Sequence, residues 1–282
     1  MFDRLSRSWG LVKASASVLQ QDKELLVFPM LSLGALLLVF LSFAAPVLGL
    51  GVLDGLHRGS SIPAAFYVIA FLFYFCQYFV IFFFNAALIG AAMIRLDGGN
   101  PTLGDGMRIA SSRIAGIAGY ALIAATVGMV LRAIQERVGF VGRIVVGLLG
   151  VGWSIATYLV VPVLVAREVG PIDAVKESAA LLKKTWGENV IGRVGLAAAF
   201  GFIFLGVVAC GALLLAGAVV AHSIPLVIAV VVLTLLALGI CALVQSALTG
   251  IYEAALYRYA TTGEGTPGFD SQTLKLAFVP KK

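Results

Sequence analysis

Four polar residues at four-residue spacing stand near the end of a long apolar run, where side chains that could carry protons or ions are rare. They are Gln245, Thr249, Glu253 and Tyr257. Because four residues make about one helical turn, all four share one face of a helix. Polar and ionisable groups inside a bilayer are costly and often mark a pathway for ions or protons. The stripe therefore predicts a polar cavity or pathway that ends near the carboxylate of Glu253.

Two further apolar runs carry polar stripes. Their residues are Tyr74, Gln77, Tyr78 and Asn85 in the run at 62–94, and Ser154, Tyr158 and Pro162 in the run at 144–166. The segments NAAL, PVLV and EAAL can be aligned, at 85–88, 162–165 and 253–256. This alignment places Gln77, Ser154 and Gln245 at one matching position, and the three stripes could then converge on a common axis.

A second interpretation gives these residues a packing role. Neutral polar side chains in membranes often join helices by hydrogen bonds, each worth on the order of 1 kcal/mol. For Glu253, this interpretation places the carboxylate at the membrane interface, paired with Arg258. Packing is favoured for the neutral residues, and the two interpretations of Glu253 are balanced. The polar candidates are Gln77, Asn85, Tyr158, Gln245, Thr249 and Glu253.

No pattern typical of a metal, cofactor or catalytic site occurs in the sequence. His57 and His222 have neither H-E-x-x-H spacing nor a nearby cysteine. No Ser-His-Asp set is recognisable, and no pair of carboxylates is placed for acid–base catalysis. We therefore predict a protein that is not an enzyme and has no metal or cofactor.

The elements that position these residues follow from composition. The chain of 282 residues is 61% hydrophobic and only 12% charged, which is far more apolar than a soluble protein. Six runs without a charge approach or exceed the roughly 20 residues that cross a bilayer as a helix. They are residues 25–53, 62–94, 114–131, 144–166, 194–221 and 224–252. The runs lack the polar alternation of a barrel, so we predict an all-α integral membrane protein with six transmembrane helices.

The placement of lysine and arginine predicts the orientation. With the N-terminus in the cytoplasm, all but four of the 20 Lys and Arg residues fall in cytoplasmic segments. The four outside are Arg58, Arg132, Arg137 and Arg143. Such an excess marks the cytoplasmic side, so both termini are predicted to be cytoplasmic. The same placement accounts for the net charge of +6, and no nucleic-acid partner is needed to explain it.

Three charged, amphipathic segments lie on the predicted cytoplasmic side. In each, apolar residues recur at alternating spacings of three and four, which places them on one helical face. The faces are Phe2, Leu5, Trp9, Val12, Ala16 and Leu19; Leu103, Met107, Ala110 and Ile114; and Ile172, Val175, Ala179, Leu182 and Trp186. Tryptophan and cations suit the headgroup region. The predicted membrane-surface residues are Trp9, Lys13, Lys176, Lys183, Lys184 and Trp186, and their predicted partners are anionic lipid headgroups.

The surface segments share a short pattern that indicates an internal repeat. KASASVL at 13–19, RIASSRI at 108–114 and KESAALL at 176–182 each start with a cation and continue with small residues. Each segment precedes two apolar runs, so we predict three repeats of surface helix plus hairpin. The first parts of the three repeats are about residues 1–56, 101–138 and 171–222. The paired spans that complete them reach residues 96, 167 and 257. Together they form one membrane domain, 1–260, followed by a cytoplasmic tail, 261–282.

Four segments carry a family resemblance. They are RLDGGNPTLGDG at 95–106, LRAIQERVG at 131–139, VVPVLV at 160–165 and LLKKTWGENVIG at 181–192. The chain resembles a family of uncharacterised six-span bacterial membrane proteins over nearly its whole length, which implies a bacterial inner-membrane location. More distantly, the repeat is similar to the membrane domain of some glycerophosphodiester phosphodiesterases. The resemblance implies no activity and no site residues.

Three functions are consistent with these observations. We expect a non-enzymatic scaffold or lipid-handling module at the cytoplasmic leaflet. The alternative is a small-solute transporter or oligomeric channel that uses the polar stripes, which a broken helix at Pro162 would favour. The third is a membrane domain for a separately encoded enzyme. A homo-oligomer or an unknown protein partner would fit each of them.

Overall fold

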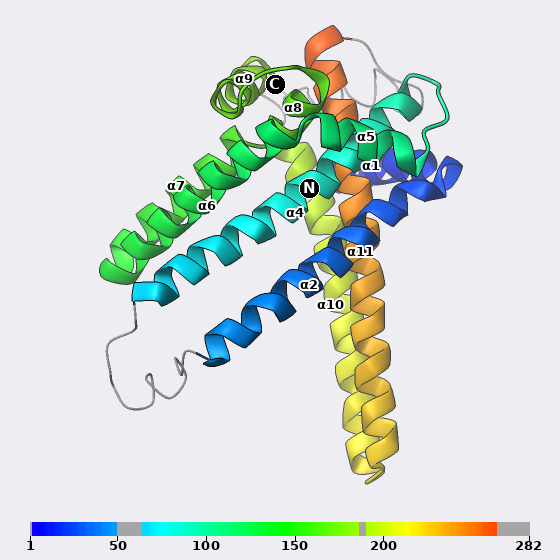
Figure 1. Cartoon of the computed structure of the whole chain (residues 1–282). Coiled ribbons are helices and arrows are strands. Elements are labelled where there is room, and N and C mark those ends of the chain that lie inside the picture. The colour runs from blue at the N-terminus through cyan, green and yellow to red at the C-terminus, as the bar shows by residue number, and fades with distance from the viewer. Residues whose placement is uncertain (1, 50–63, 186–189, 264–282) are drawn as a thin grey trace. The chain divides into compact units, whose positions relative to one another are not determined.

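A computed structural model describes residues 2–49, 64–185 and 190–263, and these residues form helices and turns with no strand among them. The elements, shown in Figure 1, are α1 (Phe2–Gln21), the 3₁₀ helix η1 (Lys23–Leu26), α2 (Val27–Gly49), α4 (Ala64–Leu96), α5 (Leu103–Ser112), α6 (Ile114–Arg137), α7 (Phe140–Ala156), α8 (Val160–Ala166), α9 (Pro171–Thr185), α10 (Val190–Val220) and α11 (Ile224–Thr262). The predicted all-α fold class is confirmed.

Among the described residues, six helical segments are long and apolar enough to cross a membrane. Five are α2 together with η1, α4, α6, α10 and α11, and the sixth is α7 continued by α8. The predicted number of spans is confirmed, although α6 continues to Arg137 and α11 to Thr262. Large apolar side chains such as Leu38 and Leu148 are exposed, as expected of residues that face lipid.

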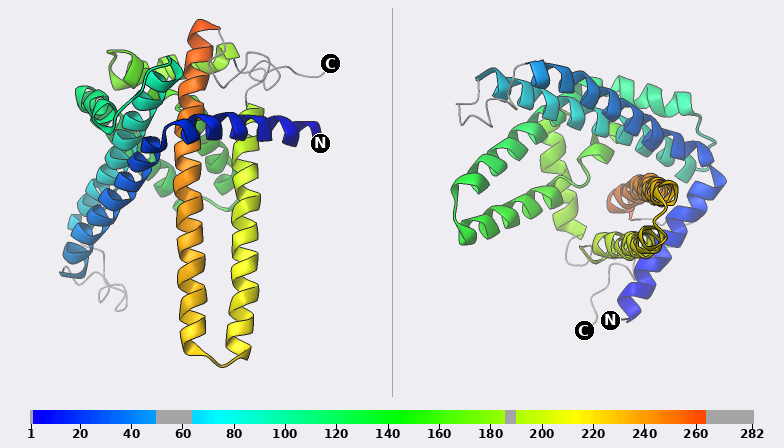
Figure 2. Two further views of the ribbon diagram at one scale, coloured as in Figure 1. Left: turned by 90° about the vertical axis from the view of Figure 1, so that its right-hand side faces the viewer. Right: turned by 90° about the horizontal axis from the view of Figure 1, so that it is seen from below.

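The described residues fall into two compact units. The first draws on residues 1–26, 92–100 and 183–282, and the second on 27–91 and 101–182. In the first unit, α10 and α11 run side by side, and α1 crosses both of them (Figure 2). In the second unit, α6 packs against α7 and α8, and Phe43 of α2 contacts Phe73 of α4 with ring centroids 5.5 Å apart. The single membrane domain stays a prediction.

In four of the spans, most buried residues gather toward one end of the helix. They cluster at 86–92 in α4, 117–125 in α6, 157–165 around α8 and 247–260 in α11. The remaining length of these helices is mostly half-buried or exposed. Within each unit, the buried ends are the ones that contact α1, α5 or α9. The best-packed part of each unit is therefore where a predicted surface helix meets the spans.

Candidate functional site

The polar stripes lie on the helices expected from the sequence. Gln77 and Asn85 are half-buried on α4, and Tyr158 is half-buried in the turn between α7 and α8. On α11, Gln245 and Thr249 are half-buried and Glu253 is buried. The first three belong to the second unit and the last three to the first. Convergence of the stripes on one axis stays a prediction.

One residue of the α11 stripe uses its hydroxyl within its own helix. Thr249 Oγ1 donates to the carbonyl oxygen of Gln245 at 2.8 Å. Such a bond back along the helix is common for threonine and leaves the hydroxyl proton engaged. This contact favours a structural role for Thr249.

One face of α4 packs against α6. The Tyr74 hydroxyl accepts a hydrogen bond of 2.6 Å from Arg132, and the Phe82 ring stacks on Tyr120 with centroids 4.5 Å apart. Tyr74 and Phe82 are eight residues apart and so share this face. Part of the predicted α4 stripe therefore serves helix packing.

Glu253 lies in the packed part of α11, where its residue is 8% exposed. The packing interpretation expected Arg258 as its partner. Arg258 forms an ion pair with Asp97, in the turn that follows α4. Both interpretations of Glu253 therefore stay predictions, and Glu253 is the acid of the candidate stripe on α11.

The fourth span is broken. Helix α7 ends at Ala156 and α8 begins at Val160, so three residues interrupt the helix, and Pro162 follows in the first turn of α8. Proline has no N–H and is tolerated at the start of a helix but not in its interior. Because hydrocarbon offers no hydrogen bonds, backbone groups at such a break need partners from the protein.

Ser178 of α9 supplies partners on both sides of the break. Its Oγ donates to the carbonyl oxygen of Ala156 at 2.7 Å and accepts the N–H of Leu159 at 3.0 Å. Ser178 and Leu159 are fully buried. Taken alone, Ser178 carries no distinctive signal in the sequence, where it is one small residue of KESAALL. The signal was a hydroxyl on a surface helix that follows a span containing a deep proline.

Two further contacts hold α9 against the second hairpin. Arg167, just after α8, pairs with Glu177 at 2.9 Å. The ring of Pro171 lies so close to Gly119 of α6 that a Cβ on the glycine would stand 2.8 Å from Pro171 Cγ. The ion pair, the close approach and the Ser178 bridge lie along half of α9, so this helix is docked through several turns.

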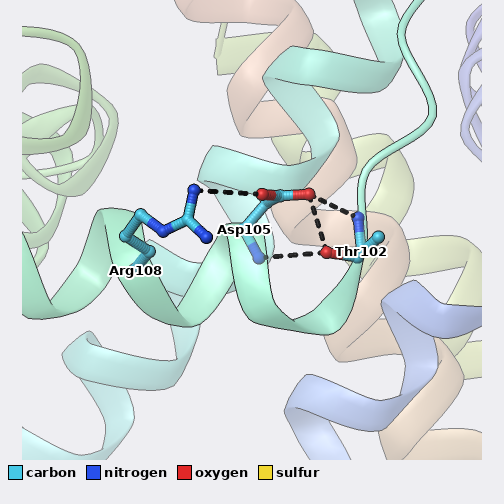
Figure 3. A network of polar contacts seen from close by, with 3 residues as sticks. All are labelled: Thr102, Asp105 and Arg108. Atoms are coloured by element: carbon cyan, nitrogen blue, oxygen red, sulfur yellow. Dashed lines mark hydrogen bonds and ion pairs between the residues drawn. The ribbon is translucent and has the colours of Figure 1, made fainter.

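Helix α5 starts with a capping box, shown in Figure 3. Thr102 Oγ1 accepts the N–H of Asp105 at 3.2 Å, and the Asp105 carboxylate accepts the Thr102 N–H at 3.0 Å and its hydroxyl at 2.7 Å. Arg108 lies 3.6 Å from the same carboxylate. These hydrogen bonds hold the pKa of Asp105 below its usual value. The cap is therefore retained until the pH falls through this lowered pKa.

The structure describes five of the six predicted membrane-surface residues. Lys13, Lys176 and Lys183 are exposed. Trp9 and Lys184 belong to α1 and α9, and Trp186 lies outside the described residues. In the part of the chain that is described, no group of three His, Cys, Asp or Glu residues could hold a metal ion. The predicted lack of metal and cofactor stays a prediction.

Most of the chain matches a protein-family model. The model of a family of unknown function, DUF6159, matches residues 64–269. The chain belongs to this family. No curated protein and no solved structure matches the chain. The matched residues of this DUF6159 protein include the broken span and α9. The predicted membership of an uncharacterised family is confirmed, whereas the distant similarity to glycerophosphodiester phosphodiesterases stays a prediction.

Proposed function

We propose that this DUF6159 protein is a non-enzymatic scaffold of the bacterial inner membrane that binds anionic lipid headgroups through its surface helices. One matching position on the three helices carries the proposal. There, Lys13, Arg108 and Lys176 are all exposed. Two residues further on, a fully buried small residue stands on each helix, namely Ser15, Ala110 and Ser178. A shift of two residues turns about halfway round a helix, so each cation lies opposite the face that docks on the spans.

Two features of α5 and α9 support the pseudo-threefold repeat. When Arg108 is aligned with Lys176, the first residues of the two helices, Leu103 and Pro171, also match. The ion pair of Asp105 with Arg108, at 3.6 Å, then corresponds to the pair of Asp173 with Lys176, at 3.1 Å. Helix start and ion pair thus agree with the alignment of the surface segments.

A matched contact between helix and span supports the repeat independently. Ile109 of α5 lies against Gly90 of α4, where a glycine Cβ would stand 2.8 Å from the isoleucine. Glu177 of α9 pairs with Arg167 at 2.9 Å. Ile109 and Glu177 match in the alignment of the surface segments, and Gly90 and Arg167 match in the alignment of NAAL with PVLV. Two separate alignments therefore select the same contact.

The contacts also assign each surface helix to a hairpin. Helix α5 packs on α2 and α4, through Gly106 against Phe28 and the Ala87 carbonyl. Helix α9 packs on the hairpin of α6 with α7 and α8, through Ser178. Helix α1 contacts α10 and α11. Each of α5 and α9 thus docks on the hairpin before it, and α1 docks on the third hairpin.

Removing two surface cations is expected to weaken retention of anionic lipid. Near an anionic surface each Lys or Arg is worth about 1 kcal/mol, so Arg108→Gln with Lys176→Gln should reduce retained phosphatidylglycerol about five- to thirtyfold. The measurement is native mass spectrometry of protein released from nanodiscs of mixed phosphatidylglycerol and phosphatidylcholine.

The matched control is Arg137→Gln with Arg143→Gln. It also removes two exposed positive charges, at the end of the α6 and α7 hairpin away from α5 and α9. This control should lose less phosphatidylglycerol than Arg108→Gln with Lys176→Gln, because its arginines lie on no surface helix. Equal losses in both double variants would show that only net charge matters and would contradict the proposal.

The broken fourth span favours a second candidate, a small-solute transporter or oligomeric channel that uses the polar stripes. Discontinuous helices frequently line the central sites of transporters. In this case Glu253→Gln should abolish proton flux into liposomes under an imposed pH gradient, because the amide cannot exchange protons. Glu136→Gln, at an exposed acid near the end of α6, is the control. Flux that is the same in both variants would remove Glu253 from this candidate.

A further inference from the structure

We propose that α9 is a latch on a hinge in the fourth span, and that the charge of the lipid beneath α9 sets how firmly the latch is closed. The inference rests on the proposed contact between surface cations and anionic headgroups. It goes beyond that contact because it assigns a conformational consequence to lipid binding by one helix.

The hinge is the break between α7 and α8. Around it the backbone bonds tighten, since the N–H of Tyr158 donates to the Ile155 carbonyl at 3.0 Å and that of Val160 to Thr157 at 3.2 Å. These bonds span three residues in place of four. Pro162 cannot donate a bond back across the break. An interrupted ladder of this kind lets the two segments change their angle without breaking either helix.

The latch is the Ser178 hydroxyl. It binds the last residue of α7 through the Ala156 carbonyl and the residue before α8 through the Leu159 N–H. Undocking of α9 would leave both backbone groups facing a hydrocarbon environment without partners, which is strongly disfavoured. A docked α9 therefore favours the observed geometry of the break.

The opposite face of α9 is built to contact headgroups. Ile172 is 61% exposed, and Lys176 and Lys183 are also exposed. At offsets of four and eleven residues, the three side chains share one face. An exposed isoleucine beside two cations suits the boundary between acyl chains and anionic headgroups. Attraction at this face would fix α9 at the membrane surface, the position from which Ser178 reaches the break.

The latch belongs to only one of the three repeats. Helices α4 and α11 are continuous where the fourth span is broken. At the position of Ser178, α5 carries Ala110, and α1 carries Ser15, whose hydroxyl has no hydrogen-bond partner. We therefore expect lipid charge to change the hydrogen exchange of residues 156–160 and not that of the matching parts of α4 and α11.

The test is hydrogen exchange of the peptide that contains residues 156–160, in nanodiscs of phosphatidylglycerol and in nanodiscs of phosphatidylcholine. We expect slower exchange in phosphatidylglycerol. Lys176→Gln with Lys183→Gln should remove this difference. Lys13→Gln with Lys23→Gln, an equal loss of charge on α1 and η1, should preserve it. A difference that persists without Lys176 and Lys183, or equal exchange in the two lipids, would overturn the inference.

Ser178→Ala tests the latch itself. It should speed exchange at 156–160 about tenfold in both lipids, because the Leu159 N–H loses its acceptor. Ser112→Ala, which removes a hydroxyl that bonds within its own helix, should leave this peptide unchanged. Unchanged exchange in Ser178→Ala would overturn the latch.

Lipid retention by native mass spectrometry of the same samples separates the two proposals. Retained phosphatidylglycerol with equal exchange in both lipids would refute only the control of the latch by lipid charge. If the unaltered protein retains no more phosphatidylglycerol than phosphatidylcholine, the lipid-binding scaffold is refuted. The control of the latch by lipid charge is then refuted with it.

Discussion

Gly106→Ala will lower the midpoint of thermal unfolding in detergent micelles, whereas Gly104→Ala, on the same turn of α5, will leave it unchanged or raise it. A Cβ at Gly106 would lie 2.5 Å from Phe28 Cζ and 2.7 Å from the Ala87 carbonyl oxygen. At Gly104 the nearest atom, Thr102 Oγ1, is 3.7 Å away. One methyl group therefore has room at one glycine and collides with a ring and with backbone at the other.

The two substitutions share every other contribution. Each replaces glycine by alanine inside a helix, which by itself stabilises the helix by about 1 kcal/mol. Overpacking at Gly106 should cost about 3 kcal/mol or more, since a backbone oxygen cannot move aside as a side chain can. Equal midpoints for both variants would show that α5 does not dock closely on α2 and α4.

The membrane spans could be predicted because a bilayer imposes length and composition on any helix that crosses it. A run without charges such as 224–252 leaves few alternatives to a transmembrane helix. The bounds were less predictable, because α11 continues to Thr262 through residues that are buried against protein. Protein contacts extend a helix beyond the length that the membrane requires, and a hydropathy pattern does not contain them.

The faces of the surface helices were harder to predict. Apolar periodicity selected Ile172, Val175 and Leu182 on α9, yet Ile172 is 61% exposed while Ala174 and Ser178 are fully buried. Helices that pack closely in membrane proteins bury small residues, because these let the backbones approach. Ile172 therefore does not mark the docking face of α9, although Leu182 is buried. The alignment of KASASVL, RIASSRI and KESAALL marks it better, through the small residue at its third position.

The break in the fourth span illustrates a different limit. Pro162 indicated a break, but a proline alone does not show where freed backbone groups find partners. The answer lies 16 residues further on, at Ser178, on another helix. Such long-range hydrogen bonds follow from how α9 docks on the hairpin, which local sequence does not encode.

Two serines at one repeat position are expected to respond in opposite directions to the same substitution. Ser15 and Ser178 are both fully buried. The Ser178 hydroxyl bridges two backbone groups, whereas the Ser15 hydroxyl has no hydrogen-bond partner. Ser178→Ala leaves the buried N–H of Leu159 and the carbonyl of half-buried Ala156 without this partner, which should cost about 2 kcal/mol. Ser15→Ala removes an unsatisfied polar group and should be neutral or stabilise by up to about 1 kcal/mol.

Thermal unfolding of both variants in one detergent measures the difference. The midpoint of Ser178→Ala should fall by several degrees, and that of Ser15→Ala should hold or rise, because about 1 kcal/mol shifts the midpoint of a chain of this size by about 2 °C or more. Midpoints that fall equally in both variants would contradict this prediction. They would mean that the two serines act as equivalent packing residues, whatever their hydrogen bonds. A fall in Ser178→Ala alone would show that the broken span depends on the hydroxyl that α9 supplies to the hairpin on which it docks.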